Sequence, residues 1–266
     1  MPFTLAHPAA VLPLRKVWPG AFLALAVGSV APDLPFFLPG EIKHALGDTH
    51  SVAGFLMIAP ALGLALLVGI VMLAPALLQP LWGKHRALLS DLIAPFRQRS
   101  LRPWIRGLAA LWIGSLSHYL CDAATHQHRD IVILLPILAA PLPGYFGISA
   151  PLFLLLQYAT SLLGLVLLGW CYLRELRSMT LPPHEGPRST AEAVWLMVIA
   201  LAASALAARA VLRTIPYHPG AGGLLYASLT HFVSDFLVLY VVFGLITSTA
   251  FKSIKPTAGL SRPFRS

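Results

Sequence analysis

Residues 117–126 read SHYLCDAATH and close an apolar run that begins near residue 107. In a helix, residues four apart lie on one face, so His118, Asp122 and His126 would stack along one side. A second pair with the same spacing, His231 and Asp235, comes late in the chain. Ionisable residues within apolar segments of this kind are costly and usually functional, so the two pairs are the first candidates for a site.

The composition indicates an integral membrane protein. The chain has 266 residues, of which 57% are hydrophobic and only 11% are charged. A soluble domain carries about 25% charged residues. We therefore expect residues 1–266 to form one integral membrane domain, with no separate soluble domain.

Apolar runs predict an all-α fold, a polytopic membrane helix bundle of five to six transmembrane helices. Each run approaches the roughly 20 residues that cross a bilayer core. The runs are 17–32, 52–74, 107–121, 149–173, 191–212 and 225–251. Residues 131–148 are apolar but broken by prolines, and we expect them to form a half-inserted segment.

Basic residues cluster in alternate loops. Of the 19 lysines and arginines, 15 fall in residues 1–16, 84–106, 174–188 and 252–265. Loops rich in basic residues stay in the cytoplasm, so the C-terminus is predicted to be cytoplasmic. The loops 33–51, 122–148 and 213–224 would then face outward. Since the basic residues share no single face, the net charge of +9 does not indicate a nucleic-acid partner.

Three acids are predicted to lie at one depth. Asp33, Asp122 and Asp235 each lie 16 or 17 residues from a basic residue on the cytoplasmic side. At the helical rise, this places each acid roughly 24–26 Å above that anchor. The histidines that fall within about a turn of this level are His50, His118, His126 and His231.

Histidines and carboxylates at one depth favour a metal site. Neutral imidazole and carboxylate suit zinc, and also manganese or iron, and seven such residues could hold two ions. His128 competes with His126 as a ligand, because a helix that ends at Thr125 favours neither. The same residues could instead only form hydrogen bonds between helices.

Several segments resemble a bacterial membrane family, the domain of unknown function 4184 family (DUF4184). The similarity covers most of the chain, and it implies no activity. The segments that carry it are MPFTLAHPA at the start, GSVAPD at 28–33, THS at 49–51, and the His118 to His126 stretch.

The order of the motifs is also similar to that of membrane-bound metal-dependent hydrolases and zinc-dependent phospholipase C. That likeness implies that His7 is a ligand, that Asp122 bridges two zinc ions, and that His231 and Asp235 bind a further ion. The chain departs from the pattern in three ways: it lacks an N-terminal tryptophan ligand, its last acid is Asp rather than Glu, and its second pair comes later.

The expected function is metal-dependent hydrolysis of a phosphoester, with a phospholipid as one candidate substrate, at the outer face of the bacterial cytoplasmic membrane. Asp122 and His118 are the expected catalytic residues, and a divalent ion, zinc above others, is the expected cofactor. The membrane lipid is the expected partner. The alternatives are a metal-binding or ion-relay membrane protein without turnover, and a helix bundle with no metal.

Overall fold

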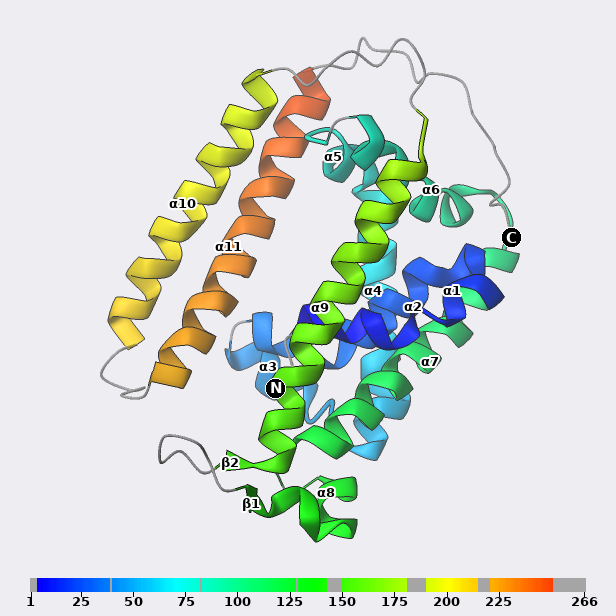
Figure 1. Cartoon of the computed structure of the whole chain (residues 1–266). Helices are drawn as coiled ribbons and strands as arrows, with labels where there is room; N and C mark the ends of the chain where they lie inside the picture. Colours follow the sequence, from blue (N-terminus) through cyan, green and yellow to red (C-terminus); the bar gives the residue numbers. More distant parts are fainter. Residues whose placement is uncertain are drawn as a thin grey trace. The chain divides into compact units, whose positions relative to one another are not determined.

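The computed structural model of the protein describes residues 4–38, 40–81, 83–127, 129–142, 150–180, 190–214 and 221–250. The fold is all-α, as predicted (Figure 1). Within these ranges the α-helices are α1 (Leu14–Val17), α2 (Phe22–Val30), α3 (Gly40–Leu46), α4 (Ala59–Met72), α5 (Ala74–Leu78), α6 (Gly83–Arg97), α7 (Arg102–Thr125), α8 (Asp130–Leu134), α9 (Leu152–Ser178), α10 (Thr190–Thr214) and α11 (Ala221–Ala250).

Shorter segments connect these helices. The 3-10 helices are η1 (Thr4–Val11), η2 (Pro19–Ala21), η3 (Ala31–Phe37) and η5 (Pro136–Ala139), and η4 (Gly54–Ile58) is a π-helix. Two-residue strands, β1 (Pro141–Leu142) and β2 (Ala150–Pro151), pair antiparallel. The chain divides into two compact units, residues 1–68 with 94–178 and residues 69–93 with 179–265. Each unit is described by itself.

Helices α2 and α7 pack at the centre of the first unit. Their backbones approach so closely that a Cβ added to Gly28 would lie 2.7 Å from the Leu111 Cα, and one added to Gly114 would lie 2.7 Å from the Ser29 nitrogen. Small residues allow this approach, as they do between helices in membranes. The contact brings the C-terminal end of α2 against the face of α7 that carries His118.

The N-terminal residues fold back onto this pair. Pro8 and Pro13 interrupt the chain, and it forms η1 and the short α1 instead of one long helix. Segment η1 packs against α2, α7 and α9, and Figure 1 shows α9 passing the blue N-terminal segments. The fold-back places His7 beside the ends of α2 and α7, far from where a straight helix would have carried it.

Prolines also shape the segment after α2. Pro32 and Pro35 lie in η3, a 3-10 helix that holds the fully buried Asp33. The chain returns through a turn at Gly47, whose φ is +75°, a value that favours glycine. Thr49 then donates from its hydroxyl to the Pro32 carbonyl (2.7 Å), and this bond anchors the loop that carries His50.

The second unit contains the late pair. Helix α11 packs against α10 and α5, and the Tyr240 hydroxyl donates to the Leu77 carbonyl (2.8 Å). His231 and Asp235 lie one turn apart on α11, so the helical spacing predicted for them is present.

Among the described residues, five helical segments are long and apolar enough to cross a membrane, which agrees with the predicted five to six. They are Pro19–Phe37, Gly54–Met72, Leu152–Ser178, Val194–Leu212 and Thr230–Thr247. The run at 107–121 lies inside α7, which is not one of the five. The segment expected to be half-inserted forms α8, η5 and β1, while its residues 143–149 lie outside the described ranges.

Candidate metal centre

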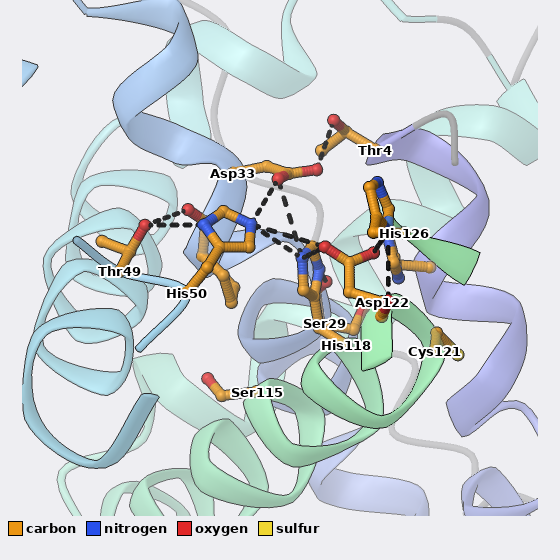
Figure 2. Close-up of polar contacts among 12 residues, drawn as sticks. Thr4, Ser29, Asp33, Thr49, His50, Ser115, His118, Cys121, Asp122 and His126 are labelled. Carbon is orange, nitrogen blue, oxygen red and sulfur yellow. Dashed lines mark hydrogen bonds and ion pairs between the residues drawn. The ribbon is translucent and has the colours of Figure 1, made fainter. Parts of the chain in front are cut away.

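Six of the predicted ligands lie together in the first unit, and five of them are labelled in Figure 2. They come from four separate parts of the chain: η1, η3, the loop before η4, and the C-terminal half of α7. The six are His7, Asp33, His50, His118, Asp122 and His126. Two overlapping groups among them could hold a metal ion, His7 with His118 and Asp122, and Asp33 with His50 and His118.

His118 is held in one orientation by the backbone of α2. Its ring is 1% exposed, and its Nδ1 lies 2.8 Å from the Ser29 carbonyl. A carbonyl only accepts, so Nδ1 must carry the proton. In the neutral ring the lone pair is then on Nε2, which faces the cluster. This is the arrangement usually found in metal-binding histidines, whose second nitrogen donates to a backbone carbonyl or a carboxylate.

His50 is oriented in the same way by its neighbour. The Thr49 hydroxyl uses its proton on the Pro32 carbonyl, so at its 3.2 Å contact with His50 Nδ1 the hydroxyl oxygen accepts. The proton of His50 therefore lies on Nδ1, and its Nε2 lone pair also faces the cluster. Asp48 supports the loop, because its Oδ1 accepts from the His50 backbone N–H (2.9 Å).

Two carboxylates face the rings of His50 and His118. Asp33 Oδ2 accepts from the Thr4 hydroxyl (2.6 Å), which leaves Oδ1 directed at His50 and His118. Asp122 directs Oδ2 at the same two rings. Two nitrogen lone pairs and two carboxylate oxygens therefore converge, as the dashed contacts in Figure 2 show.

The separations among these four atoms match a tetrahedral site. His118 Nε2 lies 3.4 Å from His50 Nε2, 3.6 Å from Asp33 Oδ1 and 3.4 Å from Asp122 Oδ2. His50 Nε2 lies 3.2 Å from Asp33 Oδ1 and 3.6 Å from Asp122 Oδ2. Ligands bonded tetrahedrally to zinc at about 2.0–2.2 Å would lie roughly 3.3–3.6 Å from one another. Four of the five separations lie in this range, and the fifth, from His50 Nε2 to Asp33 Oδ1, is slightly shorter at 3.2 Å.

The other oxygen of Asp122 faces a second pair of rings. Asp122 Oδ1 lies 3.3 Å from His126 Nδ1 and 3.8 Å from His7 Nε2. His7 Nε2 and Asp122 Oδ1 are both buried, and neither has a hydrogen-bond partner in the described part of the chain. Buried polar atoms are rarely left unsatisfied, so this pair also indicates a missing partner.

His7 is suited to bind as a neutral ligand. Its ring stacks on His118, with centroids 3.8 Å apart, and is 4% exposed. Burial, and then the neighbouring His118, lower the pKa of His7 to about 3. The ring is therefore neutral at physiological pH, as metal coordination requires.

The end of α7 places His126 but not its competitor His128. Helix α7 ends at Thr125, and His126 follows in an extended conformation, with its Nδ1 beside Asp122. His128, the competing ligand, lies outside the described residues. His231 and Asp235 belong to the second unit and form no part of the two groups among the described residues. That they join the site stays a prediction.

A small pocket adjoins the cluster in the first unit. It reaches His118, His50 and Asp122. The pocket is lined by Pro32, Thr49, His50, Phe55, Ser115, His118, Tyr119, Asp122 and Arg129.

Several supporting groups were not predicted as parts of a site. Thr4 was not among the candidate residues, yet its hydroxyl donates to Asp33. The Ser29 carbonyl is a backbone group and carries no sequence signal, while Thr49 could have been inferred from its place beside His50. Gln157 on α9 lies 3.5 Å from His126 Nε2, and its position in a long apolar run was the available signal.

The comparisons with known proteins give a family but no activity. A family model described as a domain of unknown function (DUF4184) matches residues 1–252. No curated protein and no solved structure matches the chain. The likeness to membrane-bound hydrolases and to phospholipase C thus gains no support from the comparisons.

Proposed function

The chain belongs to the DUF4184 family, and we propose that it is a membrane-embedded, metal-dependent hydrolase of a phosphoester. The observation that carries the proposal is the convergence of the Nε2 lone pairs of His50 and His118 with two carboxylates. With both rings neutral, these four atoms would repel one another unless a cation lay between them. A divalent cation would balance the two negative charges of Asp33 and Asp122.

Zinc suits this set of ligands best. Two imidazole nitrogens and two carboxylate oxygens are a donor set that zinc accepts in tetrahedral geometry. Manganese and iron take the same donors, usually in larger coordination shells. The separations of 3.2–3.6 Å among the four atoms favour the smaller, tetrahedral shell.

Asp122 supports a centre with two metal positions. Its Oδ2 faces His50 and His118, while its Oδ1 faces His7 and His126. A carboxylate with both oxygens directed at nitrogen ligands can bridge two ions. A pair of ions of this kind activates a water molecule and polarises the oxygens of a phosphoester.

The pocket beside the cluster reaches His50, His118 and Asp122, and turnover would require it to open further for a substrate. The charge distribution of the loops favours an outward-facing site and a cytoplasmic C-terminus, so an outer-leaflet phospholipid is the first substrate to test. Fusions that report sidedness at residues 95, 135 and 182 would check the orientation, and an external signal at residue 95 would reverse it.

The burial of the cluster favours a second candidate, a metal-binding or ion-relay protein without turnover. Asp33, His118, His7 and Asp122 are each at most 4% exposed, which leaves little room for a substrate at the ion. In that case the cluster would bind or pass an ion, and the pocket would admit only water.

Elemental analysis of the protein purified in detergent is the deciding experiment. We expect at least one equivalent of zinc and a chelator-sensitive release of headgroup from mixed phospholipids. Stoichiometric metal without turnover on any phosphoester would favour the binding protein. Folded wild-type protein without metal would exclude both and leave a buried network of histidine–aspartate contacts.

A further inference from the structure

Arg129 lies at the pocket, in the short connection between α7 and α8. Its backbone N–H donates to the His126 carbonyl (3.3 Å), and its side chain is half-buried. Arg129 and Asp122 are the two lining residues with a permanent charge at neutral pH. The positive charge therefore lies on the same small pocket as His50, His118 and Asp122.

No carboxylate neutralises this guanidinium within the described part of the chain. In the described part of the chain its side chain makes one hydrogen bond, from Nη1 to the His50 carbonyl (2.6 Å). The neighbouring acid, Asp130, instead accepts from the Tyr119 hydroxyl. A guanidinium has five N–H donors in a planar fork, so most of the donors of Arg129 are available to a ligand in the pocket.

From this arrangement we propose that Arg129 binds the anionic oxygens of the substrate and holds a phosphate group against the metal centre. The inference rests on the proposed function and deepens it. Arginine is suited to the task because its fork matches two phosphate oxygens at once. It would select charged phosphoesters over neutral esters, which offer the fork no anionic oxygen.

Arg129 would complement the charge of the cluster. A divalent ion would balance Asp33 and Asp122, and a phosphate would then add negative charge that the guanidinium attracts. Arg129 adds a positive charge on the open side without occupying a ligand position. Arg129 also donates a hydrogen bond to the His50 carbonyl. A test must therefore separate its binding of an anion from its effect on the position of His50.

The test uses full-length protein in detergent, loaded with zinc, with metal content measured on every sample. The variants are Arg129→Gln, Arg129→Lys and the control Arg102→Gln, which removes an exposed arginine at the first residue of α7. Calorimetric titrations with inorganic phosphate and with a short-chain phosphatidylglycerol below its micelle concentration form the two arms. They distinguish a free phosphate group from a lipid headgroup as the source of the anion.

Wild type and Arg102→Gln should bind at least one of the two probes with equal affinity. Arg129→Gln should weaken that binding about tenfold or more at full zinc occupancy, since a hydrogen bond to a charged group contributes about 1.5–3 kcal/mol. Arg129→Lys should fall between them, because it keeps the charge and loses the fork. If Arg129→Gln fails to fold, a several-fold loss in Arg129→Lys at full zinc occupancy carries the same conclusion.

Equal affinity in wild type and the Arg129 variants, or no binding of either probe by the wild type, would overturn the inference. A loss of zinc that by itself explains the weaker binding would also overturn it, because Arg129 would then only support the His50 loop. The proposed function is judged separately, by the zinc content of the wild type. If the wild type takes up no zinc but still binds a probe through Arg129, the anion site is kept and the metal centre is rejected.

Discussion

The chain carries two histidine–aspartate pairs with identical spacing, and they lie in different surroundings. His118 is 1% exposed and meets groups from η1, η3 and the His50 loop. His231 and Asp235 on α11 are half-buried, and neither belongs to the two possible metal-binding groups among the described residues. The comparison teaches that the spacing places two side chains on one face, whereas the neighbouring segments decide whether a cluster forms.

The largest expected effect separates the two pairs directly. Asp122→Asn should lower bound metal below about a tenth of the wild-type content, because it removes a charge that faces both groups of histidines. Asp235→Asn should retain at least about half of the metal, since the six clustered residues would still be present. Elemental analysis of both variants, with His85→Ala on α6 as a control, measures the difference. Equal losses would place the second pair in the centre.

The close contact of α2 with α7 is what distinguishes the surroundings of the first pair, and a single methyl group should disturb it. In Gly114→Ala the added Cβ would lie 2.7 Å from the Ser29 nitrogen, a backbone atom that cannot move aside alone. Overpacking of this kind costs roughly 1–3 kcal/mol. Thermal unfolding in detergent should show a lower midpoint and reduced metal content. Gly169→Ala on α9, where nothing lies within 4 Å, is the matched control and should leave both unchanged.

Removal of metal should destabilise the wild type, in which His118 and Asp122 are expected to bind the ion, but not a variant that has lost the site. Zinc at about 100 times its dissociation constant would stabilise the folded state by about 2.7 kcal/mol. Dialysis against a chelator should therefore lower the unfolding midpoint of the wild type by several degrees. Asp122→Asn should show no further shift. A wild-type midpoint that does not change with chelator would contradict the metal centre.

Loss of the hydrogen bond from Thr4 to Asp33 should have the smallest of these effects. Thr4→Val removes the hydroxyl that donates to Asp33 Oδ2 and leaves the shape of the side chain nearly unchanged. Groups that orient metal ligands typically contribute 10- to 100-fold in affinity, so we expect zinc affinity to fall by about tenfold. Competition with a chelating dye measures it. Thr160→Val on α9, whose hydroxyl bonds only its own helix, should match the wild type.

The sequence predicted the parts of the fold that depend on local pattern. Apolar runs predicted the five helical segments that are long and apolar enough to cross a membrane, and the four-residue spacing predicted the alignment of His118 with Asp122. Asp33 was found by its distance from a basic anchor, which depends only on helical rise. These features follow from short-range geometry, so a single sequence is sufficient to find them.

The contacts that complete the cluster depend on the tertiary fold and could not be predicted. His7 reaches Asp122 only because η1 folds back on α2, and nothing in its spacing from Arg15 indicates that turn. The Ser29 carbonyl acts through its backbone, which is the same in every residue. Arg129 was counted as one basic residue of an outward loop, since its distance from His50 depends on how that loop packs.

The fold-back of η1 has a consequence for the order in which the protein can mature. His7 and Asp33 are made early, yet their partners Asp122 and His126 come from the end of α7, which follows α3, η4, α4, α5 and α6 in the chain. Before α7 is made, Asp33 can meet Thr4 and His50, whereas His7 has no carboxylate partner within the cluster. The cluster can therefore close only after α7 has been synthesised, and a chain truncated before residue 122 would lack both Asp122 and His126.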